Sequence, residues 1–274
     1  MTLRAAKTAD YVKIVSRLHS VGTQKSPEIH DHPVGWEYSS LMRCFLLHIL
    51  TSVEIMLKLY QDSPDYFPVT NAYILLRSMF ELNITARYIS QDPRRRSTAY
   101  IDYGCVLSRR RFEKHLKHRN TKREEWRDLV RAMLSYEFNP KRRQEISQNY
   151  EKVRQKFEFV DKKGRVRQFP NWANKSLRQM ANEVDHDLEY DLLYSKYSDI
   201  THGTVRLADR FLKIRHRRMS WSTGSQEPDV AFLFRDVGGI LSCFLLLLGR
   251  QFRLQLDEDI KKCWTDDIDY IYIG

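Results

Sequence analysis

Three long apolar runs constrain the fold of this chain most strongly. Residues 37–60, 71–90 and 229–256 are apolar on nearly every helical face and contain only isolated polar residues. A helix that is apolar all round lies inside a protein, so these runs predict central helices. Glycine and proline are scarce, with 10 and 8 among 274 residues, which favours long helices over short strands and tight turns. The sequence therefore predicts an all-α fold.

The apolar pattern predicts a single helical domain over 1–274, built as a bundle of about eight to ten helices. The hydrophobic content of 42% is enough for a packed core without disulfides or metals. Within this domain we expect a peripheral N-terminal helix and loop over 1–33 and the bundle over 34–256. Residues 257–274 form an acidic, aromatic tail.

Two segments add detail to this helical pattern. Two short alternating segments flank Gly164, which predicts a short β-hairpin or an extended loop near 158–172. The stretch "YSKYSDITHGTV", residues 194–205, predicts a helix that ends near Gly203, because glycine often terminates helices. After Gly203, residues 204–218 predict a basic amphipathic helix.

The charge balance points to a polyanionic partner. Lys and Arg number 46 against 35 Asp and Glu, which gives a formal net charge of +11. Such an excess attracts RNA, DNA or an acidic protein.

Several features indicate a cytoplasmic protein without a membrane span. The N-terminal residues lack the apolar core of a signal peptide, and the longest uncharged run, 237–249, is shorter than the roughly 20 residues that a span needs. The cysteines are far apart and lack metal-ligand spacing, so we interpret them as buried thiols in a reducing compartment. They are Cys44, Cys105, Cys243 and Cys263.

Two polar groups stand out against their apolar surroundings. Arg77 and Glu81 are four residues apart on a central helix, so their side chains can pair. Ser198 and His202 are also four apart, on one stripe with Tyr194. His202 could act as a general acid or base with Ser198 orienting it, or it could simply bond main chain at a helix end. We expect Arg77, Glu81, Ser198 and His202 to meet, either as catalytic residues or as a buried structural network.

A second set of residues could form a positive surface that follows phosphates. An alternative is that these charges only keep helix faces solvated. The expected nucleic-acid-binding residues are Arg109, Arg110, Arg111, Lys114, Lys117, Arg206, Arg210 and Lys213.

The usual cofactor and metal motifs are absent from the sequence. No P-loop, dinucleotide-binding, HExxH or GxSxG motif occurs. The histidine pairs at 30 and 32 and at 115 and 118 lack carboxylate or thiolate partners at ligand spacing. We predict no metal and no cofactor.

The segments "ILLRSMFELNITARYI" and "NWANKSLRQMANEVDHDLEYDLLYSKYSDITHGTV" resemble an uncharacterised, all-helical bacterial family of unknown function. The shared pattern is Arg-x3-Glu, Trp-x3-Ser-Leu and Tyr-x3-Ser-x3-His. In this chain the pattern falls on Arg77, Glu81, Trp172, Ser176, Leu177, Tyr194, Ser198 and His202.

More distantly, the family resembles the HEPN helical bundles. Catalytic HEPN proteins cleave RNA with an Arg-x4-6-His pair that acts across a dimer interface. Lys196 stands six residues before His202, so Arg77 or Lys196 would supply the cation here. The resemblance implies a metal-independent endoribonuclease of a bacterial defence or toxin system, acting as a homodimer. The alternative is a non-catalytic helical module that binds nucleic acid or a protein partner.

Overall fold

The computed structural model describes most of the chain, and helices dominate it, which confirms the all-α fold. The described residues are 7–30, 32–118, 124–201, 212–215, 218–221 and 227–264. They form two compact units, one of residues 1–93 with 177–274 and the other of residues 94–176. No change of composition marks either boundary in the sequence.

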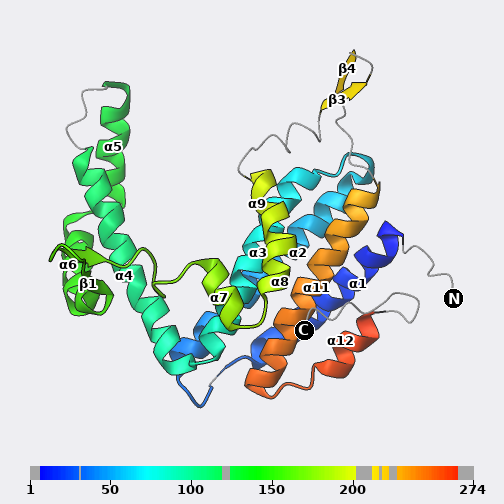
Figure 1. Cartoon of the computed structure of the whole chain (residues 1–274), viewed down its shortest axis with the longest axis horizontal. Coiled ribbons are helices and arrows are strands. Elements are labelled where there is room, and N and C mark those ends of the chain that lie inside the picture. Colours follow the sequence, from blue (N-terminus) through cyan, green and yellow to red (C-terminus); the bar gives the residue numbers. More distant parts are fainter. Residues whose placement is uncertain are drawn as a thin grey trace. The chain divides into compact units, whose positions relative to one another are not determined.

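Unit 1 holds the three apolar runs as central helices, as predicted (Figure 1). Its helices are α1 (Thr8–Lys25), α2 (Trp36–Asp62), α3 (Val69–Ser90), α7 (Leu177–Glu183), α8 (Asp187–Glu189), α9 (Ser195–Thr201), α11 (Glu227–Phe252) and α12 (Asp257–Cys263). Short 3-10 turns cover Ser26–Glu28 and Pro64–Tyr66, a π-helical turn covers Tyr190–Tyr194, and two strands, β3 and β4, cover Leu212–Arg215 and Arg218–Trp221.

Helix α1 belongs to the core of unit 1 rather than to its periphery. It packs along α11 and α2, and its Ile14, Val15 and Leu18 are at most 1% exposed. At Gly22 the helices approach so closely that an added Cβ would lie 2.9 Å from Leu50. The sequence pattern of α1 is only weakly apolar, which is why the helix looked peripheral.

Two core helices are long and apolar enough to cross a membrane. They are Trp36–Asp62 and Pro228–Phe252, whose most apolar windows are 50% and 78% buried. Length and composition alone do not separate such helices from the core helices of soluble proteins.

Unit 2 is a smaller helical unit with its own apolar clusters. It contains α4 (Pro93–Lys117), which begins at the boundary, α5 (Glu124–Tyr136), α6 (Pro140–Val153), a 3-10 turn (Arg154–Phe157), β1 (Glu158–Val160) and β2 (Val166–Gln168). One cluster contains Tyr103, Val106, Val153 and Phe157. The other contains Phe112, Leu134, Phe138 and Ile146.

The antiparallel pair β1–β2 confirms the predicted hairpin. Gly164 adopts a φ of +73° in its turn, a conformation that favours glycine. The Asp161 carboxylate accepts hydrogen bonds from the backbone N–H groups of Lys163 and Arg165 and thereby closes the turn.

A second antiparallel hairpin, β3–β4, overlaps the segment where the sequence predicted a basic helix. The prediction of a helix through 204–218 was wrong for residues 212–215 and 218. Leu212 pairs with Trp221 and Ile214 pairs with Met219, so apolar residues alternate with polar ones along both strands. That period of two is typical of strands, and over four residues it is easily confused with helical spacing.

The cysteines are only partly buried. Cys243 and Cys263 are buried and Cys105 is half-buried, but Cys44 is exposed on α2. The interpretation of Cys44 as a buried thiol was therefore wrong, because α2 is apolar beyond the face that it buries.

Candidate functional site

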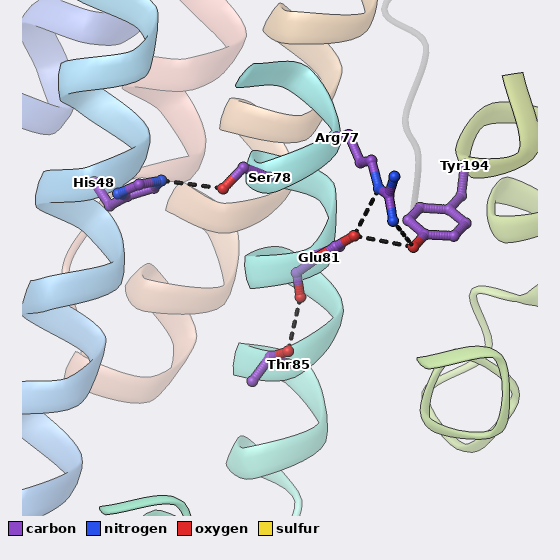
Figure 2. Close-up of polar contacts among 6 residues, drawn as sticks. All are labelled: His48, Arg77, Ser78, Glu81, Thr85 and Tyr194. Carbon is purple, nitrogen blue, oxygen red and sulfur yellow. Dashed lines mark hydrogen bonds and ion pairs between the residues drawn. The ribbon is translucent and has the colours of Figure 1, made fainter. Parts of the chain in front are cut away.

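Helix α3 carries polar side chains on two faces, one toward α2 and one toward Tyr194 (Figure 2). Toward α2, Ser78 shares a hydrogen bond of 3.1 Å with His48 Nε2. Toward Tyr194, the side chains of Arg77 and Glu81 lie together because they are four residues apart on the helix. The second face forms the candidate site.

Arg77, Glu81 and Tyr194 form a closed triangle of hydrogen bonds, which we call the REY cluster (Figure 2). Arg77 Nε donates to Glu81 Oε1 at 2.9 Å, and Arg77 Nη2 donates to Tyr194 Oη at 2.9 Å. Tyr194 Oη in turn donates to Glu81 Oε1 at 2.9 Å. The guanidinium carbon also lies 5.1 Å from the centre of the Tyr194 ring, within range of a cation–π interaction.

The REY cluster lies at the rim of unit 1 and is not sealed from solvent. The side chains of Arg77 and Glu81 are 20% and 41% exposed. Burial raises the pKa of Tyr194, and the nearby Glu81 carboxylate raises it further. Burial lowers the pKa of Arg77, but hydrogen bonds to Glu81 and Tyr194 outweigh this and leave the pKa raised. The cluster therefore holds an Arg77–Glu81 ion pair beside a neutral phenol.

A π-helical turn, Tyr190–Tyr194, carries Tyr194 to α3. Tyr190 stacks on Tyr194 with ring centres 4.7 Å apart, and Phe80 lies 5.9 Å from Tyr194 on the α3 side. Single π turns inside helices occur often at functional sites. Tyr190 was not among the predicted site residues, although its spacing of four from Tyr194 could have indicated the stack.

A second polar centre lies one turn further along, between α9 and α11. Tyr197 Oη donates to Asp236 Oδ2 at 3.1 Å, and Arg235 Nη2 donates to Asp236 Oδ1 at 2.9 Å. Asp236 is only 3% exposed. Burial and the Asp236 carboxylate together raise the pKa of Tyr197 far above its ordinary value. This centre holds α9 in place behind the REY cluster.

The comparisons with known proteins identify the family of the chain. A family of unknown function, DUF5677, matches residues 40–219. The chain belongs to DUF5677. The search of curated proteins and the search of solved structures gave no match.

The DUF5677 match includes every residue of the predicted catalytic set. The structure joins Arg77 and Glu81, as predicted, and adds Tyr194 to them. Ser198 lies in α9, four residues after Tyr194. His202 directly follows the last described residue of α9 and lies outside the described residues, so its place in the site stays a prediction.

Three consecutive arginines of α4 contact other residues of unit 2. Arg109 pairs with Glu113 at 2.7 Å, and Arg111 pairs with Glu137 at 2.9 Å. Arg110 donates to the carbonyl of Phe169 at 2.7 Å and so ties α4 to the end of the hairpin. These arginines therefore stabilise the unit, whatever else they bind.

The structure places three of the other five predicted nucleic-acid-binding residues. Lys114 and Lys117 lie exposed at the end of α4. Lys213 lies in β3, and Arg206 and Arg210 lie outside the described residues.

The histidine pairs mostly bond main chain. His32 Nδ1 accepts from the Val34 N–H, and Nε2 lies 3.0 Å from the Gln251 carbonyl. The Nδ1 atoms of His30 and His115 lie 3.1 Å and 2.7 Å from the carbonyls of Pro27 and Arg111. Within the part of the chain that the structure describes, no group of three or more His, Cys, Asp or Glu side chains gathers as a metal site.

His186, which precedes α8, is a buried histidine beside the π turn. Its side chain is 1% exposed, Nε2 has no hydrogen-bond partner, and Glu189 Oε2 lies 3.5 Å from Nδ1. Burial and the positive charge of Arg87 lower the pKa of His186 to about 4. The folded protein therefore holds this imidazole neutral.

Acid should destabilise unit 1 through His186. The unfolded chain binds a proton at His186 near pH 6.5, whereas the folded chain does so only near pH 4. The contribution of neutral His186 to the free energy of unfolding is complete above pH 6.5. It is lost as the pH falls from 6.5 to 4, by at most about 1.4 kcal/mol per pH unit. Urea unfolding of wild type and His186→Gln at pH 7.5, 6, 5 and 4 measures this. Equal pH dependence in both proteins would contradict it.

Proposed function

We propose that the protein is a metal-independent endoribonuclease whose site contains Arg77, Glu81, Ser198 and His202. The observation that supports this most is the orientation of Arg77, which donates hydrogen bonds to Glu81 and Tyr194 although its side chain is 20% exposed. A cation held in a fixed orientation at a solvent boundary suits the charge that develops on a phosphodiester during cleavage. Tyr194 joins the site as the residue that completes the orientation of Arg77.

The reaction is transfer of the phosphoryl group to the neighbouring 2'-hydroxyl. A base removes the 2'-OH proton, the 2'-oxygen attacks phosphorus, and the 5'-oxygen leaves with a proton. The products are a 2',3'-cyclic phosphate and a 5'-hydroxyl. His202 exchanges these protons and Ser198 orients its imidazole, Arg77 stabilises the negative charge on the phosphorane, and Glu81 positions Arg77.

The setting of this activity follows from the sequence resemblance. The HEPN-like pattern suggests a homodimeric RNase of a bacterial defence or toxin system, which works in the cytoplasm and not in a membrane. The positive net charge of +11 suits an RNA substrate. The distant sequence resemblance alone carries the defence or toxin setting.

A second candidate function is a non-catalytic helical module. The three side-chain hydrogen bonds among Arg77, Glu81 and Tyr194 join α3 to the π turn, as a structural clamp would. Under this proposal the cluster stabilises the fold, and the protein binds nucleic acid or another protein.

Cleavage of a defined RNA separates the two functions. Purified wild type is incubated with a 5'-labelled, 30-nucleotide single-stranded RNA in EDTA, beside His202→Ala. The endoribonuclease proposal expects cleavage by wild type with 2',3'-cyclic phosphate ends. His202→Ala should cleave at least about a hundredfold more slowly. Circular dichroism checks that both proteins fold equally.

Two results would contradict the endoribonuclease proposal. One is that wild type leaves a panel of single-stranded and structured RNAs intact. The other is that His202→Ala cleaves as fast as wild type, which would attribute the activity to other residues or to a contaminant.

A further inference from the structure

A groove lies between the end of α4 and α5 in unit 2. Its volume is about 890 Å3. Lysine and histidine side chains from α4 form one wall, and α5 forms the other. The lining residues are Lys114, His115, Lys117, His118, Trp126, Leu129, Val130 and Met133.

The α4 wall of the groove is positive. Lys114, Lys117 and His118 are exposed, and none of the lining side chains that the structure describes is a carboxylate. By contrast, the preceding arginines Arg109 and Arg111 each pair with a glutamate. Lys114 and Lys117 make no ion pair with any side chain that the structure describes. The wall therefore favours a ligand that carries negative charge.

The α5 wall is apolar and exposed. Trp126, Leu129, Val130 and Met133 follow helical spacing of i, i+3, i+4 and i+7, so they form one stripe. Trp126 is 50% exposed and Leu129 is 47% exposed. Val130 packs on the cluster around Phe112, which continues the core of the unit into the groove. Exposed tryptophan and leucine side by side are typical of a protein-binding surface.

We propose that this groove binds an acidic, amphipathic segment of a partner protein. Apolar side chains of the segment would cover Trp126, Leu129 and Met133, and its carboxylates would face Lys114 and Lys117. Helices that lay an apolar face into a groove are a common mode of peptide recognition.

The composition of the groove favours a protein over a nucleic acid. RNA offers bases for stacking on Trp126 and phosphates for the lysines, but it has no aliphatic groups to match Leu129, Val130 and Met133. Sequence-tolerant RNA surfaces use several large aromatic rings, whereas the described lining of this groove contains one tryptophan, two histidines and no tyrosine or phenylalanine. The inference is independent of the proposed catalytic site, because the groove contains none of its residues. It does assign Lys114 and Lys117, two of the expected nucleic-acid-binding residues, to a protein partner instead.

Peptide selection tests the proposal on the full chain. A phage library of random 16-residue peptides is selected on wild type and counter-selected on Lys114→Glu/Lys117→Glu. We expect enriched peptides that combine Asp or Glu with large apolar residues at helical spacing. A fluorescein-labelled copy of an enriched peptide should bind Trp126→Ala and the double lysine variant at least about tenfold more weakly than wild type.

The matched control is Lys141→Glu/Lys152→Glu, which reverses two exposed lysines of α6 outside the groove. It should bind the peptide as wild type does. Because the substituted groove residues are exposed, circular dichroism spectra should stay unchanged. Failure to enrich peptides whose binding depends on Lys114 and Lys117 would overturn the proposal. Tighter binding of a 12-nucleotide oligouridylate than of any enriched peptide, through the same residues, would also overturn it and assign the groove to nucleic acid.

Discussion

Arg77→Ala is expected to lower the rate of RNA cleavage about a thousandfold. Arg77 is the cation of the REY cluster, oriented by Glu81 and Tyr194 through hydrogen bonds of 2.9 Å. Under the endoribonuclease proposal, its charge stabilises the phosphorane more than the substrate, so its removal lowers kcat as well as kcat/KM. Single-turnover cleavage of the labelled RNA measures the rate of the chemical step.

Two arginine variants control for charge and for folding. Arg77→Lys keeps the charge but loses the planar fork, so we expect it to recover only a small part of the rate. Arg178→Ala removes an exposed arginine of unit 1, which pairs with Asp191 at 3.1 Å, and should cleave as wild type does. If Arg77→Ala cleaves at the wild-type rate, Arg77 has no role in the reaction. The RNase site would then lie elsewhere.

Asp236→Ala is expected to reduce the free energy of unfolding by about 3–5 kcal/mol. Asp236 is 3% exposed and accepts hydrogen bonds from Tyr197 and Arg235, so its loss leaves a buried hydroxyl and a guanidinium without their acceptor. Tyr197→Phe removes one donor and keeps the ion pair with Arg235, so it should cost only about 1 kcal/mol. Urea unfolding followed by far-UV circular dichroism gives both values.

Asp65→Ala is the matched control for Asp236, because Asp65 is exposed in a short turn of the same unit. We expect a change within about 0.5 kcal/mol of wild type. A similarly small effect for Asp236→Ala would show that the Asp236 centre does not hold α9 to α11.

The Arg77–Glu81 pair on α3 was predictable from the sequence. Opposite charges four residues apart on a helix lie on one face, and charges on an apolar helix are usually paired. Tyr194 was on the predicted stripe, but its bond to Glu81 depends on the π turn, which shifts the register of the side chains and leaves no clear mark in the sequence. Asp236 was missed for a different reason. It borders the apolar run of 237–249 and therefore looked like the boundary of that run.

Elements of the fold that depend on local sequence were predictable, whereas those that depend on tertiary contacts were not. The central helices and the hairpin near Gly164 follow from local pattern and turn chemistry. The core position of α1 depends on its contact with α11, which local pattern does not reveal. Likewise, a run of arginines looks like a nucleic-acid surface until the partners of Arg109, Arg110 and Arg111 are known.

The central claim is that Arg77 and His202 act in one RNA-cleaving site, and a double-variant cycle tests it most directly. Single-turnover cleavage rates are measured for wild type, Arg77→Ala, His202→Ala and the double variant, all with matched circular dichroism spectra. Residues that act as a unit have strongly non-additive effects, so the double variant should cleave about as slowly as the slower single variant. A double-variant rate reduced by the product of the two single-variant factors would contradict the claim. A wild-type rate in either single variant would also contradict it.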